Sequence, residues 1–143
     1  MFKYGYVLML LIIICLPAVQ ASAQGEPTYL GEICYSMMCD GCIAAPPMVS
    51  RLGMLLYGPD HLLLTGAGGT HGAASVDGTN IIVLLSSAFV ISDQNQFSQI
   101  HMVVNPTTLW GTYTEMLVGI IPPPVQIFST KGFVEFFPCG PGI

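Results

Sequence analysis

The sequence predicts an all-β protein, an antiparallel up-and-down β-barrel of about eight strands. Short runs rich in Val, Ile, Tyr, Phe and Thr alternate with Gly, Pro, Asn and Asp along residues 24–143. No segment there shows the 3.6-residue apolar period of an amphipathic helix. The connections between runs are too short to hold the helix that parallel strands need. A meander closed into a barrel also leaves no exposed sheet edge. A β-sandwich is the alternative, and it requires a longer connection between two sheets.

The first 23 residues read as a secretory signal peptide. Lys3 precedes the apolar run Val7–Cys15, and the small residues Ala21-Ser22-Ala23 precede the expected cleavage site. The run is shorter than the ~20 residues that cross a bilayer as a helix. We therefore expect a signal peptide at 1–23, a single barrel domain at 24–143, and a secreted or periplasmic location.

Each predicted strand is an apolar or β-branched run bounded by turn residues. In the first half of the chain the strands are expected at Thr28–Met37, Val49–Tyr57, His61–Gly66, Gly72–Val76 and Thr79–Ser86. Residues 39–47 form a loop that ends in two prolines, and 58–60 form a Gly-Pro-Asp turn. Gly66 to Gly69 requires a loop or a bulge. Asp77-Gly78 favours a type I′ hairpin turn, because both residues readily take positive φ.

The second half is expected to continue the meander with strands at Phe97–Val104, Leu109–Val118, Val125–Thr130 and Phe133–Cys139. The polar stretch 92–96 reads as a loop. Asn105-Pro106 turns the chain, since Pro fixes φ and Asn hydrogen-bonds its own backbone. Prolines 122–124 favour a stiff connection. Lys131-Gly132 is expected to form the last hairpin turn.

Removal of Cys15 with the signal peptide leaves four cysteines, which in an oxidising compartment indicates disulfides. Three pairings are possible, and we favour Cys34–Cys139 with Cys39–Cys42. The first closes a loop of about 100 residues, which contributes up to ~4–5 kcal/mol in the chain-entropy model. It also places the first and last strands side by side, as a barrel requires. A redox-active Cys39/Cys42 pair is one alternative, and a zinc site formed by Cys34, Cys39, Cys42 and a histidine is another.

Charge excludes some classes of partner. The chain has 3 Lys and Arg, 8 Asp and Glu, and a formal net charge of −5. After cleavage Arg51 and Lys131 are its basic side chains, too few for the phosphate contacts of nucleic-acid binding. We therefore expect no nucleic-acid partner, and no membrane contact once the signal peptide is removed.

The apolar composition requires a cover for the outer face of the sheet. The run Ile81–Leu85 and the residues Phe133, Val134, Phe136 and Phe137 place apolar side chains on both faces. Loops of the same chain, a second subunit or a membrane would cover them, and a homo-oligomer is one of the expected partners. An outer-membrane barrel is disfavoured, because spanning takes ~9–11 residues per strand and several candidates are shorter, His61–Gly66 especially.

Three segments give the chain a resemblance in layout to known proteins. They are Gly31-Glu32-Ile33-Cys34, Thr108-Leu109-Trp110-Gly111-Thr112, and the closing run from Gly132 to Cys139. With them the chain resembles small exported bacterial proteins of uncharacterised function, and its plan is similar to lipocalin-like and avidin-like meander barrels. The resemblance implies a barrel fold. No binding residue is transferred from it.

No catalytic, cofactor or metal motif stands out. Ser36, Ser75, Ser86 and Ser87 lack the Gly-x-Ser-x-Gly context of a nucleophile, and the histidines share no metal-binding spacing. Glu32 and Glu135 could approach each other if Cys34 bonds Cys139, and paired carboxylates hydrolyse glycosides. We expect no enzyme and no cofactor.

Two hypotheses about the function remain. The first is a non-enzymatic binder of a small apolar ligand, because small barrels can hold one ligand inside. The residues expected to line such a pocket are Tyr35, Tyr57, Met102, Trp110, Tyr113 and Phe136. The second is a structural or interaction protein of the cell envelope, with a filled barrel.

Overall fold

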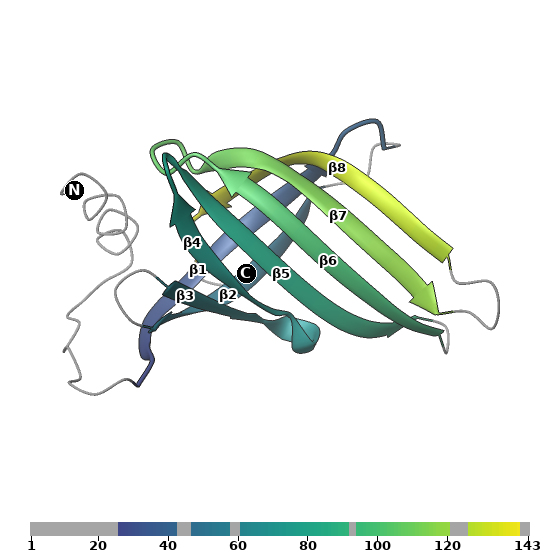
Figure 1. The fold of residues 1–143 in the computed structure, drawn as a ribbon, viewed down its shortest axis with the longest axis horizontal. Helices are drawn as coiled ribbons and strands as arrows, with labels where there is room; N and C mark the ends of the chain where they lie inside the picture. The colour runs from purple at the N-terminus through teal and green to yellow at the C-terminus, as the bar shows by residue number, and fades with distance from the viewer. Residues whose placement is uncertain (1–25, 43–46, 58–60, 92–93, 121–125, 141–143) are drawn as a thin grey trace.

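The strands form one closed antiparallel barrel (Figure 1). The computed structural model describes residues 26–42, 47–57, 61–91, 94–120 and 126–140. In these ranges each strand pairs with the next along the chain, and the last pairs with the first. The predicted up-and-down barrel is confirmed. Its strands are β1 (Thr28–Cys39), β2 (Met48–Tyr57), β3 (His61–Gly66), β4 (His71–Asp77), β5 (Asn80–Ile91), β6 (Gln94–Val104), β7 (Trp110–Ile120) and β8 (Gln126–Phe137), with one 3₁₀ turn, η1 (Ala67–Gly69), between β3 and β4.

Side chains alternate between the barrel interior and its outer face, as the pleat of a strand requires. In the continuous apolar run of β5, Ile81, Val83 and Leu85 are buried. Leu84, between two of them, is 54% exposed on the outer face. The run therefore supplies both the core and an apolar outer surface.

Apolar side chains fill one half of the barrel. Leu52, Met54, Val104 and Val134 are at most 2% exposed there. A void in this half measures only about 30 Å³, the order of one water molecule. Leu109 covers this end, between β6 and β7, and packs against the core. This half is therefore closed.

The other half is built mainly by the longer strands. β5 to β8 have 11 or 12 residues each, whereas β3 and β4 have 6 and 7. Figure 1 shows these four long strands reaching past η1. They form an extended wall around the end of the barrel that lies beside η1 and the β1–β2 connection.

The predicted turn at Asn105 is confirmed, together with the hydrogen bonds from its side chain to the backbone. The Asn105 side-chain oxygen accepts hydrogen bonds from the backbone N–H groups of Thr107 at 2.8 Å and Thr108 at 3.1 Å. Leu109 follows with a positive φ of 59° and donates its own N–H to the Asn105 carbonyl. The next strand therefore begins at Trp110, one residue later than the sequence predicts.

Several predicted strand limits are wrong by a few residues. The β4–β5 turn uses Gly78 and Thr79 rather than Asp77 and Gly78, and Asp77 pairs with Asn80. Gly78 supplies the positive φ, at 61°. The end of the predicted polar loop 92–96 belongs to a strand, because β6 begins at Gln94 and pairs with the extended end of β5.

The predicted last hairpin is also wrong, because β8 runs unbroken through Lys131 and Gly132. A side chain at Gly132 would place its Cβ 2.0 Å from the carbonyl oxygen of Met38 in β1. Glycine therefore marks a close approach between two strands at the barrel closure, and not a turn.

Some expectations lie outside the described residues. They are the signal peptide at 1–23, the turn at 58–60, and the connection at 122–124.

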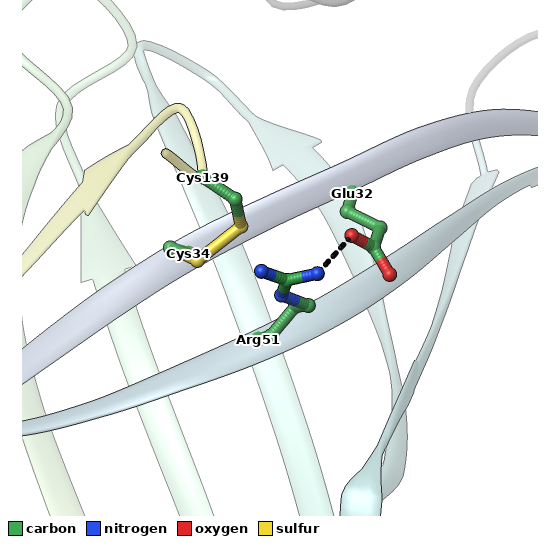
Figure 2. Close-up of polar contacts among 4 residues, drawn as sticks. All are labelled: Glu32, Cys34, Arg51 and Cys139. Atoms are coloured by element: carbon green, nitrogen blue, oxygen red, sulfur yellow. Dashed lines mark hydrogen bonds and ion pairs between the residues drawn. A yellow bond between two sulfur atoms is a disulfide. The ribbon is translucent and has the colours of Figure 1, made fainter. Parts of the chain in front are cut away.

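The first and last strands meet as the cysteine argument predicts. β1 pairs with β8 from Cys34–Phe137 to Cys39–Gly132. Cys34 faces outward, and the chain after β8 turns back over the outer face so that Cys139 reaches it (Figure 2). Cys39, the last residue of β1, pairs with Cys42. Both pairs agree with the favoured connectivity, and such pairs are typical of an oxidising extracellular or periplasmic compartment.

Gly132→Ala is expected to destabilise the barrel by about 2–3 kcal/mol, because the new Cβ requires β1 and β8 to separate. Gly119→Ala in β7 is the matched control, since the new Cβ would lie 3.9 Å from the Gln126 carbonyl oxygen, an ordinary contact distance. Urea unfolding followed by circular dichroism measures both. Equal stability of the two variants would contradict the close approach.

The two disulfides are expected to differ in their contribution to stability. They span sequence separations of 105 and 3 residues. In the chain-entropy model, loss of the long loop costs about 4.7 kcal/mol and loss of the short one about 1.6 kcal/mol. Paired Cys→Ser variants, Cys34 with Cys139 and Cys39 with Cys42, test this by urea unfolding. A larger loss in the Cys39/Cys42 variant would refute the ranking.

Candidate ligand cavity

A cavity of about 610 Å³ occupies the half of the barrel that the core leaves unfilled. Its volume lies within the ~300–1,000 Å³ typical of small-molecule sites. Inward-facing residues of six strands form the wall, and the β1–β2 connection and Thr70 complete the rim. The lining residues are Tyr35, Met37, Met38, Cys39, Cys42, Pro47, Met48, Ser50, Thr70, Ser87, Phe89, Ser98, Ile100, Tyr113, Glu115 and Thr130.

A carboxylate lies in the wall of this cavity and accepts hydrogen bonds from two neighbouring strands. Ser98 of β6 donates its hydroxyl to Glu115 Oε1 at 2.6 Å. Thr130 of β8 donates to Glu115 Oε2 at 3.4 Å. The register explains the grouping, because Glu115 stands directly opposite Thr130 and beside the β6 segment that carries Ser98. A carboxylate has about four acceptor positions, so capacity remains for a ligand.

Two tyrosines extend this polar group. Tyr113 forms a hydrogen bond with Thr130, and Tyr35 forms one with Ser50. Burial raises the pKa of both phenols above the usual 10.0, the hydrogen bonds oppose the shift, and the negative charge of Glu115 adds to it. Both phenols therefore stay protonated at neutral pH and can donate hydrogen bonds into the cavity.

The lining changes from polar and buried to apolar and exposed toward the rim. Ser98 is 2% exposed and Tyr113 is 4% exposed. At the rim, Met38 is 40% exposed and Met48 is 75% exposed. The cavity thus has a hydroxyl-rich interior with one carboxylate and a rim of flexible apolar side chains.

The predicted pocket residues are divided among three places. Tyr35 and Tyr113 line the cavity. Phe136 packs beneath Tyr35, with 5.6 Å between ring centroids, and Met102 is fully buried in the core. Tyr57 and Trp110 lie on the outer face, 50% and 43% exposed, because each is out of phase with the inward residues of its strand.

The residues that sequence reasoning missed are Ser98, Glu115 and Thr130. The alternation of side chains along a strand could have identified one of them, because Glu115 is two residues from Tyr113 and must share its face. The partners of Glu115 depend on the registers of β6 and β8, which the sequence does not reveal.

The other candidate sites are not assembled. Glu32 forms an ion pair with Arg51 at 2.8 Å on the outer face (Figure 2). Glu135 stands opposite Ser36, four residues further along β1, which corresponds to about 13 Å. The proposed carboxylate pair is therefore wrong. Cys34 is also separated from the Cys39–Cys42 pair, and the described part of the chain contains no group of three or more His, Cys, Asp or Glu that could hold a metal ion.

Comparisons with protein-family models, with curated proteins and with solved structures found no match. No helix in the described ranges has the length and hydropathy to span a bilayer.

The buried phenols predict a loss of stability in alkali. The pKa of each tyrosine is higher in the folded than in the unfolded protein. Its contribution to the free energy of unfolding is therefore fully present below pH 10 and is lost as the pH rises through the folded-state pKa. The double variant Tyr35→Phe/Tyr113→Phe should therefore lose less stability between neutral pH and pH 11 than the parent. Urea midpoints across this pH range measure the difference. Parallel profiles for the two proteins would contradict the assigned burial.

Proposed function

We propose that this protein is a non-enzymatic binder of a small, largely apolar ligand held in the cavity at the open end of the barrel. One observation carries the proposal: one half of the barrel is packed to a residual void of about 30 Å³, whereas the other encloses about 610 Å³. A chain that fills one half efficiently does not require a hollow in the other for stability, since empty volume costs contacts.

The chemistry of the wall supports the same proposal. Phe89, Ile100 and Met37 provide apolar contact, and Ser87, Ser98 and Thr130 provide convergent hydroxyls. Ligand sites commonly combine apolar walls with a few placed polar groups. Methionines at the rim adapt to varied ligand shapes, because the thioether chain is unbranched and polarisable.

We place this activity outside the cytosol, in a secreted or periplasmic protein. The two disulfide pairs support an oxidising compartment, and residues 1–23 supply the export signal in this proposal.

The outer face favours a second function, that of an interaction protein of the cell envelope which assembles with further copies of itself. Leu84, Val90, Ile127 and Phe133 are between 53% and 66% exposed. Exposed apolar side chains on several strands of one sheet are suited to subunit contact.

A cavity-filling variant tests ligand binding. Ser87 faces the cavity opposite Ser98, so Ser87→Phe should lower the affinity for an uncharged apolar dye such as N-phenyl-1-naphthylamine by about ten-fold or more. Ser86→Phe is the matched control, because the adjacent residue faces outward opposite Gln99 and should bind the dye as the parent does. Fluorescence titration measures all three proteins.

Dye binding that is equal in the two variants would place it on the outer face and refute the cavity proposal. If light scattering then shows stable oligomers, the result favours the second function.

A further inference from the structure

The distribution of charge across the barrel wall indicates which ligand the cavity selects. Arg51 follows the cavity residue Ser50, and Lys131 follows the cavity residue Thr130. Alternation turns both cations to the outer face, where Arg51 pairs with Glu32. The imidazoles of His71 and His101, next to Thr70 and Ile100, are exposed in the same way.

Glu115 is the one acidic or basic side chain among the residues that line the cavity in the described ranges. Its neighbours are hydroxyl groups from Ser98, Thr130 and Tyr113, all of them neutral donors. Glu115 is partly buried, and a carboxylate that loses its remaining water when a ligand binds is normally paired with a cation. In the described residues the cavity wall does not supply that cation, which leaves this role to a ligand.

We propose that the ligand is a cationic amphiphile whose protonated amine binds Glu115 while its apolar tail extends along the rim of the cavity. This inference rests on the proposed function and deepens it. The buried polar interior receives the head group, and the tail contacts the partly buried Phe89 and the exposed rim residues Met38 and Met48. An ammonium group has three donors, which fit the remaining acceptor positions of Glu115 and the oxygens of Tyr35 and Ser98.

The same geometry selects against anionic ligands. A fatty acid would place a second negative charge beside Glu115, with no basic side chain in the cavity wall to offset the repulsion. The overall charge of −5 also attracts cations and repels anions at long range. An uncharged alcohol of the same chain length would keep the apolar contact and lose only the ion pair.

Calorimetry with a matched ligand series tests the proposal on the disulfide-bonded protein. Decylammonium, decanol and decanoate share one tail and differ in head group. We expect decylammonium to bind about ten-fold or more tightly than decanol, and decanoate most weakly. Glu115→Gln keeps the size and an acceptor for Ser98, and it should remove the preference for the amine over the alcohol. Glu135→Gln removes a charge from the outer face and should leave that preference unchanged.

Three results would overturn the proposal: no saturable binding of decylammonium, a decanol affinity equal to that of the amine in the parent protein, or an amine preference that survives Glu115→Gln. The parent series decides the question even if Glu115→Gln does not fold. Failure of the proposed function gives a different result, because Ser87→Phe and Ser86→Phe would then bind the dye equally. If the two variants differ in dye binding but the parent protein does not prefer the amine, only the assignment of the head group is refuted.

Discussion

The structure depends on the pairing of β1 with β8, which converts a meander of strands into a closed wall. Six residue pairs join these strands, from Cys34–Phe137 to Cys39–Gly132. The Cys34–Cys139 link lies at one end of this seam, and Gly132 permits a close approach of the two strands at the other. Without closure both strands would be exposed edges, and the interior would open along its length. A cavity with a defined interior and rim exists only because this seam holds.

The two halves of the barrel show how one alternating pattern can build a core and a cavity. Inward positions in the closed half carry Leu, Met and Val, and these residues meet across the axis. Inward positions beyond them carry Ser, Thr and Glu, which bond along the wall to adjacent strands. Side chains that form hydrogen bonds along the wall do not extend to the barrel axis, so the centre of this half stays unfilled. The change from apolar to hydroxyl residues along the inward face is therefore the feature that creates the cavity.

Sequence reasoning predicted the fold well because its signals are local. Strand patterning, the Asn105 turn and the need to close a meander each follow from a few neighbouring residues. It failed where glycine has more than one role: Gly78 marks a turn, whereas Gly132, within an equally plausible turn pair, marks a strand contact. The difference depends on β1, about 90 residues away in the sequence, because the relevant neighbour is the Met38 carbonyl.

The site was predicted less well because large aromatic side chains do not reveal from the sequence which face of a strand they occupy. Aromatic residues bury area on either face of a sheet, so size alone placed Tyr57 and Trp110 beside Tyr35 and Tyr113. Phase along the strand separates them, and it also identifies Glu115 as an inward residue. A charged residue in phase with buried apolar neighbours breaks the usual pattern of a barrel wall. No cationic residue faces Glu115 in the described cavity wall, so we attribute this break to the proposed ligand rather than to the stability of the wall.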